Sequence, residues 1–253
     1  MTSVFGAIRR YRDLRWLLAW VVTVAALGAW DLAFLNRPAL KKVVVGFANT
    51  FLIASLVIAL TLGLAWATTL VLHFLESRRR HVAYLAVTFI LNVIRSIPQI
   101  VGILFGYVAV SALRDRGLLP GAVAVYALLA LCMSVFIFLE VVDLMRSRIE
   151  HYRSLDFFNA MQVCGIPQRR IVNFDILWKN SRIHIFNKLI SVFGMAVFLQ
   201  CSVDFIISVG LSTDVSGVSL PTTLGSLLAK IDSKQDILAI GHTLTHPSYV
   251  GNL

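Results

Sequence analysis

Four polar side chains interrupt long apolar stretches of the sequence, where they could contact a polar solute. Arg95 precedes Gln99 by four residues, and Gln200 precedes Asp204 by the same spacing, so each pair would share one face of a helix. Charged groups inside a membrane span are costly unless they face water or a partner. We predict that these four residues line a solute path. The alternative is a structural ion pair between Arg95 and an acid such as Glu140 or Asp204.

The spacings that catalysis or metal binding requires are absent from the sequence. It holds no paired carboxylates, no H-E-x-x-H, no nucleophile and base at a useful spacing, and no G-x-x-x-x-G-K-[ST] phosphate loop. His242 and His246 are four residues apart, but no third ligand accompanies them. Cys132, Cys164 and Cys201 have no metal or redox spacing. We therefore predict no enzyme activity, no metal and no cofactor in this chain.

The elements that would hold the polar residues are membrane spans. Of the 253 residues, 58% are hydrophobic and only 14% are charged. About 20 apolar residues suffice to cross a bilayer as a helix. The sequence predicts an all-α polytopic protein that forms a single domain over residues 1–253. Its five predicted spans are residues 16–35, 43–74, 82–113, 118–145 and 185–211, with a kink at Pro98 and Gly102 in the third.

The distribution of Lys and Arg predicts a cytoplasmic N-terminus. Of the 23 basic residues, 15 lie in the N-terminal segment and in the links after the second and fourth spans, whereas 7 lie on the other side. Positive residues are retained on the cytoplasmic side. We predict a multi-pass protein of the cytoplasmic (inner) membrane, whose net charge of +10 reflects topology and contact with lipid rather than with nucleic acid. The alternative for residues 1–35 is a cleaved signal peptide, but no A-x-A site follows the long apolar run.

Residues 150–182 form a basic, amphipathic loop between the fourth and fifth spans. Ser154 is predicted to cap a helix that begins at Leu155 and stops at Gly165, and Pro167 to start a second helix. Apolar residues gather on one side of each helix: Phe157, Phe158, Met161 and Cys164 on the first, and Ile171, Phe174, Ile176 and Leu177 on the second. Such a pair would lie at the inner membrane surface, where it would either anchor in lipid or contact a cytosolic protein.

The spacing in this loop resembles the EAA loop of binding-protein-dependent ABC transporter permeases. That pattern is Glu-Ala-Ala, three residues, Gly, and further on Ile-Leu-Pro. The corresponding residues here are Asn159, Ala160 and Met161, then Gly165, then Ile176 and Leu177. The Glu and the Pro of the pattern are replaced. In that family the loop binds an ATPase subunit and transmits its movement to the spans.

Flanking segments are similar to the same family, in the same order. Residues 48–70 look like its second span, 193–211 like the span after the loop, and 219–231 (SLPTTLGSLLAKI) like an external segment of the dipeptide, oligopeptide and nickel permeases. Residues 95–105 (RSIPQIVGILF) look like phosphonate-type permeases. The family has a last span after the external segment, which residues 212–253 do not supply. We expect either a shortened chain or a divergent five-span form.

The resemblance implies the permease subunit of an ABC importer. Its expected partners are ATPase subunits that hold ATP and Mg, a second identical or related permease subunit, an external solute-binding protein and membrane lipid. The solute would be a peptide or a small polar or metal-containing compound. The alternative class is a polytopic protein without transport activity, either an assembly subunit or a membrane-embedded enzyme, whose loop anchors in lipid.

Overall fold

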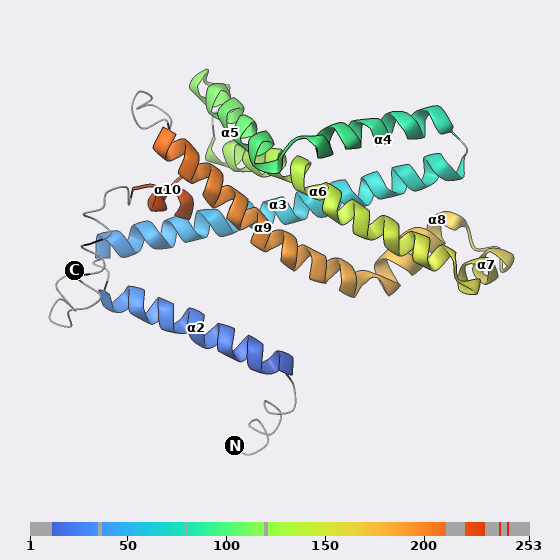
Figure 1. The fold of residues 1–253 in the computed structure, drawn as a ribbon, viewed down its shortest axis with the longest axis horizontal. Helices are drawn as coiled ribbons and strands as arrows, with labels where there is room; N and C mark the ends of the chain where they lie inside the picture. Colours follow the sequence, from blue (N-terminus) through green and yellow to red (C-terminus); the bar gives the residue numbers. More distant parts are fainter. Residues whose placement is uncertain are drawn as a thin grey trace, which may run out of the picture. The chain divides into compact units, whose positions relative to one another are not determined.

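The computed structural model describes residues 12–34, 37–78, 80–118, 121–210, 221–230, 238 and 242. Over these residues the chain is helical, with short turns and no strand, so the all-α prediction is confirmed for this part (Figure 1). The chain divides into two compact units. One consists of Met1–Val45 with Ile231–Leu253, and the other of Gly46–Lys230.

The first unit contains α2 (Arg12–Phe34). Its large apolar side chains, such as Trp16, Trp20 and Leu32, are exposed. The apolar stretch Arg15–Trp30 is shorter than the other candidate spans. This helix corresponds to the first predicted span, which is therefore not confirmed as a full crossing.

Three helices are long and apolar enough to cross a membrane: α3 (Arg37–Ser77), α6 (Ala122–Arg153) and α9 (Arg182–Gly210). A fourth span results if the bent pair α4 (His81–Ser96) and α5 (Gln99–Asp115) is one crossing. The described residues therefore hold three or four candidate spans, as a multi-pass membrane protein would have. The prediction of five is not confirmed.

The predicted kink in the third apolar run is present as a break of 91° between α4 and α5 (Figure 1). A proline disfavours helical geometry in the residue before it, and Ile97, which precedes Pro98, is extended. The helix α4 therefore ends before Pro98, and α5 begins after it. Gly102 does not contribute to the bend. It lies inside α5, where an added Cβ would collide with the ring of Phe136, so it allows α5 to pack closely against α6.

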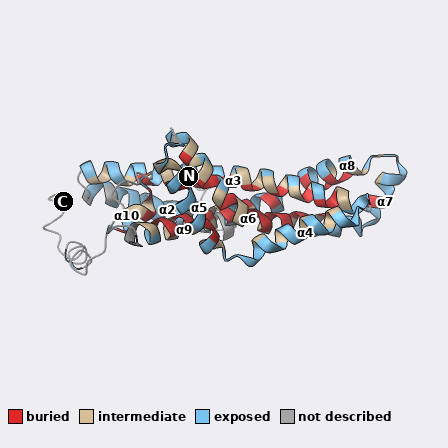
Figure 2. Cartoon of the chain, turned by 90° about the horizontal axis from the view of Figure 1, so that it is seen from above, coloured by how far each residue is buried: buried red, intermediate tan, exposed pale blue. Residues whose placement is uncertain are grey.

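The core of the second unit is built by α3, α5, α6 and α9. Ile53, Ile103, Met133 and Val192, one from each helix, are fully buried. Figure 2 shows buried residues along the length of α6 and exposed ones along much of α4. The exposed side chains of α4 include large apolar ones, such as Phe89. A helix with so apolar an outer surface suits contact with lipid rather than with water.

The predicted loop lies at one end of the second unit (Figure 1). It contains α7 (Asp156–Val163), the short α8 (Gln168–Arg170) and the π-helix η1 (Ile171–Asn180), which leads into α9. The C-terminal ends of α3 and α6 and the N-terminal end of α4 lie at this same end. The last described helix, α10 (Leu224–Leu228), packs against α9 away from the loop.

Candidate functional site

The helix α7 begins at Asp156, and its N-cap residue is Leu155. The predicted cap by Ser154 is wrong. The Ser154 hydroxyl donates instead to the carbonyl of His151 at 2.7 Å, in the last turn of α6. Serine hydroxyls compete in this way for nearby backbone carbonyls. The helix α6 therefore continues to Arg153, and the loop is reached directly from its end.

The turn that ends α7 confirms the predicted stop at Gly165. Gly165 has a φ of 77°, in the left-handed region that favours glycine. Its N–H donates to the carbonyl of Gln162 at 2.9 Å, and the N–H of Ile166 donates to that of Met161 at 3.2 Å. These two bonds form a Schellman motif, which satisfies carbonyls that the helix end leaves free. Pro167 then precedes α8, close to the predicted start.

The apolar side chains of the loop pack into the bundle less uniformly than predicted. On α7, Phe158 is buried and Met161 is half-buried, but Phe157 and Cys164 are exposed. On η1 the fully buried residues are Ile171, Val172, Ile176 and Leu177, whereas Phe174 is half exposed. The pattern follows the π-helix, in which residues five apart lie on one face. An α-helical spacing therefore missed Val172 and wrongly included Phe174.

The outer surface of α7 is open. Asp156, Asn159, Ala160, Gln162 and Val163 are exposed, and Val163 has 88% of its surface accessible. We call these five residues the α7 face. The six residues that match the EAA pattern thus divide by position: Asn159, Ala160 and Gly165 lie open, Met161 is half-buried, and Ile176 and Leu177 are buried. The last two hold the loop in place and do not form part of its surface.

Polar contacts that the sequence did not reveal tie the loop to α3. Ser77 Oγ donates to Gln168 Oε1 at 2.8 Å, and Gln168 Nε2 lies 3.1 Å from His73 Nε2. Earlier on α3, Trp66 Nε1 donates to Asn173 Oδ1 at 2.7 Å. These partners are about a hundred residues apart in the chain, so no local pattern pairs them. The loop is consequently anchored to α3 as well as continuous with α6 and α9.

Arg95 forms an ion pair with an acid, as the structural alternative expected, but the acid is Asp143 rather than Glu140 or Asp204. Its Nη2 lies 2.7 Å from both carboxylate oxygens of Asp143 on α6, and the two side chains are 54% and 56% exposed. Glu140 pairs instead with Lys188 of α9 at 2.7 Å. Arg95 and Gln99 do not share a helix face, because the break at Pro98 separates them. Gln99 Nε2 donates to the carbonyl of Phe136 at 3.4 Å.

Gln200 and Asp204 are buried at the α10 end of α9. Thr223 donates its hydroxyl hydrogen to the Asp204 carboxylate, and the N–H of Leu224 donates to Thr50 Oγ1 at 3.1 Å. These bonds close the start of α10 over Asp204. The Gln200 amide is fully buried and has no hydrogen-bond partner among the described residues.

The four predicted path residues therefore do not form one cluster: Gln200 and Asp204 lie one turn apart on α9, and Arg95 lies elsewhere. Lys188 and Asp204 are 16 residues apart on α9, which is about 24 Å along a helix. The Lys188–Glu140 pair adjoins Asp143 on α6, the partner of Arg95. Arg95 and Asp204 thus lie at different levels, one beside the break between α4 and α5 and the other beneath α10.

No protein-family model, curated protein or solved structure matches the chain. Within the described ranges, no group of three or more His, Cys, Asp or Glu side chains could hold a metal ion. His246 lies outside the described residues, as does most of the predicted external segment 212–253. The candidate site is therefore defined by the loop and by the polar residues of the bundle.

Proposed function

We propose that this chain is the membrane-spanning subunit of an ABC importer, and that the α7 face binds an ATPase subunit. The observation that carries the proposal is a short helix that is firmly anchored on one side and open on the other. Phe158 is buried on one side of α7, Ile176 and Leu177 are buried in η1, and Asn159 and Ala160 are exposed. This arrangement suits a protein partner that binds the exposed side of α7.

The composition of the α7 face favours a protein partner over a lipid anchor. An amphipathic anchor buries its apolar face in the headgroup region and turns its polar face to water. Here the α7 face is mainly polar or small, and Phe158, Ile171, Val172, Ile176 and Leu177 are buried in the bundle. Other large apolar side chains of the loop, such as Phe157, Phe174 and Trp178, are exposed but do not belong to the α7 face. Val163 is the one large apolar residue of the α7 face.

The connections of the loop give it a route to the spans. The helix α7 follows directly from α6, η1 continues into α9, and Gln168 contacts His73 and Ser77 on α3. A displacement of α7 would therefore act on three spans together. In the proposed cycle, ATP binding draws the loops of two permease subunits together and turns the path outward, and hydrolysis resets it.

The solute path is assigned to Arg95, Gln99, Gln200 and Asp204, together with the same residues or their counterparts in a second permease subunit. An external solute-binding protein would deliver a peptide or a small polar or metal-containing solute. The N-terminus would be cytoplasmic in the inner membrane. Lipid surrounds the subunit, ATP and Mg belong to the ATPase, and nucleic acid has no part in the cycle.

Substitutions on the α7 face test the proposal. The full chain is purified from its native membrane, and the proteins that accompany it are identified by mass spectrometry. We expect a protein with a G-x-x-x-x-G-K-[ST] loop, which Ala160→Glu and Val163→Glu remove. The matched control is Asn180→Glu, an exposed position at the end of η1. Absence of such a protein, or its retention by both α7 variants, would reject the proposal and favour the assembly subunit with a lipid-anchored loop.

A further inference from the structure

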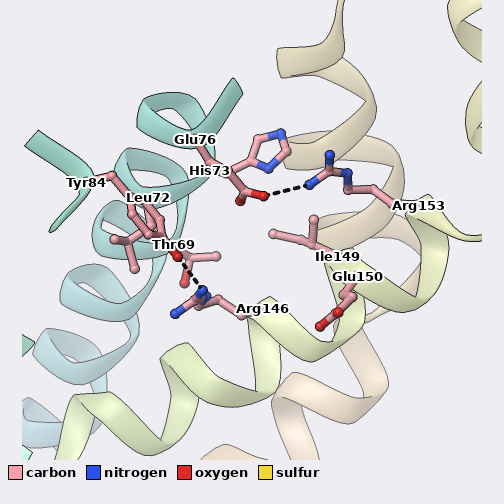
Figure 3. A pocket seen from close by; sticks show the side chains of 9 residues that line it. All are labelled: Thr69, Leu72, His73, Glu76, Tyr84, Arg146, Ile149, Glu150 and Arg153. Atoms are coloured by element: carbon pink, nitrogen blue, oxygen red, sulfur yellow. Dashed lines mark hydrogen bonds and ion pairs between the residues drawn. The ribbon is translucent and has the colours of Figure 1, made fainter. Parts of the chain in front are cut away.

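A polar cavity of about 160 Å³ lies between α3, α4 and α6, close to the loop but apart from the α7 face. Seven polar residues line it: Thr69, His73, Glu76, Tyr84, Arg146, Glu150 and Arg153 (Figure 3). None of them is a predicted path residue or belongs to the α7 face. Its volume is roughly ten times the ~10–15 Å³ that one water requires, so a small polar group fits.

The charges of the lining balance. Arg146 and Arg153 contribute two positive charges, and Glu76 and Glu150 contribute two negative ones. Arg153 Nη1 lies 3.5 Å from Glu76 Oε1, so these two side chains form an ion pair with each other. This leaves Arg146 and Glu150 as the groups available to a ligand.

Arg146 and Glu150 present opposite charges one helical turn apart. Arg146 Nη2 donates to the Tyr84 hydroxyl at 3.0 Å, which leaves its charge without an acidic partner (Figure 3). Among the described residues, the Glu150 carboxylate has neither a hydrogen bond nor an ion pair. Side chains four apart on a helix lie about 5–6 Å from each other at Cβ. A neutral ligand that carries separated positive and negative charges matches this spacing.

We propose that this cavity binds the phosphoethanolamine head group of a membrane lipid, with its phosphate on Arg146 and its ammonium on Glu150. A purely anionic head group would meet Glu76 and Glu150 as well as the arginines, so a zwitterion complements the lining better. Guanidinium–phosphate and ammonium–carboxylate contacts are both charge-assisted hydrogen bonds, which are among the stronger polar contacts.

The surroundings of the cavity favour a lipid over a soluble zwitterion. Tyr84 lines the cavity from α4, and the same helix exposes Val82, Leu85 and Phe89. Acyl chains could lie on this apolar surface while the head group enters the cavity. Tyrosine and arginine are also the side chains that commonly sit at the level of lipid head groups. This inference does not depend on the proposed transport function.

Lipid binding to the purified full chain in mild detergent tests the inference. Native mass spectrometry measures retention of phosphatidylethanolamine and of phosphatidylglycerol, and a parallel titration uses the water-soluble glycerophosphoethanolamine. We expect about a fivefold preference for phosphatidylethanolamine over phosphatidylglycerol. Glu150→Gln should reverse this preference, because the lining then carries a net positive charge. Arg146→Gln should weaken retention of both lipids.

Controls separate recognition from folding. Arg182→Gln removes an exposed charge at the start of α9, outside the cavity, and should leave the preference unchanged. If Arg146→Gln fails to fold, Arg146→Lys is tested in its place. This variant keeps the charge and should retain the preference for phosphatidylethanolamine. Equal retention of the two lipids by the native chain, or an unchanged preference in Glu150→Gln, would overturn the proposal. Binding of glycerophosphoethanolamine as tightly as the lipid would overturn the assignment to a lipid.

Discussion

Replacing Gly165 by alanine tests whether the turn after α7 is held in one conformation. Gly165 has a φ of 77°, and a Cβ added there would meet no atom within 4 Å. The cost of the substitution is therefore backbone strain alone. The left-handed conformation costs an L-residue roughly 1–2 kcal/mol. The closed loop should lose this amount of stability relative to locally open forms.

Limited proteolysis of the full chain in detergent measures this loss. Trypsin can cleave after the exposed Arg169 and Arg170 when the loop opens. When opening is fast relative to cleavage, the rate follows the population of the open form. A shift of 1–2 kcal/mol corresponds to cleavage about 5- to 30-fold faster. Cleavage after the exposed Arg80, outside the loop, is the internal reference.

Gly194→Ala is the matched control for this experiment. Gly194 lies inside α9, and a Cβ there also meets no atom within 4 Å, but no positive φ is involved. Cleavage after Arg169 and Arg170 should stay at the native rate in this variant. If Gly165→Ala also leaves the rate unchanged, the argument that this turn holds the loop is refuted.

The remaining predictions concern the bundle that supports the loop. Arg95→Gln and Asp143→Asn should couple by no more than about 1 kcal/mol in a double-mutant cycle of thermal stability, because both side chains are more than half exposed; a larger coupling would contradict this reading. Gly225→Ala should destabilise the chain by about 1–3 kcal/mol and lower its Tm, because the new methyl group would collide with the backbone of Cys201; an unchanged Tm would show that α10 does not pack as described. Phe158→Ala should cost about 3–5 kcal/mol in chemical unfolding, since this ring is buried beneath α7, and a loss below about 1 kcal/mol would show that it does not anchor the helix.

Features that depend on one or two neighbouring residues could be predicted from the sequence. Gly165 followed by Pro167 predicted a helix stop and a new helix start, and both are present. Pro98 predicted a kink in the third apolar run, and α4 and α5 are separated there. In both cases the signal is the backbone chemistry of glycine or proline, which tertiary contacts rarely override.

Features that depend on contacts across the bundle could not be predicted. The pairing of Arg95 with Asp143 depends on how α4 packs against α6, which no local pattern specifies. Ser154 is of a residue type that commonly caps helices, but its hydroxyl donates instead to the carbonyl of His151 in α6. The surface of η1 was misassigned because nothing in its composition separates a π-helix from an α-helix.

The buried polar residues of α9 illustrate a mixed outcome. Gln200 and Asp204 stood out as polar residues in an apolar run, and both prove to be buried side chains of one helix. Their spacing did not reveal that Thr223 donates to Asp204 from a segment 19 residues further along the chain. Whether the two line a solute path stays a prediction.

A cross-link from the native Cys164 tests the central claim most directly. This thiol is exposed beside the α7 face, whereas Cys132 and Cys201 are half-buried and are first replaced by alanine. A photoreactive maleimide attached to Cys164 is activated in native membranes. The proposed function predicts a cross-link to a nucleotide-hydrolysing protein. A label that reacts with lipid alone would contradict it.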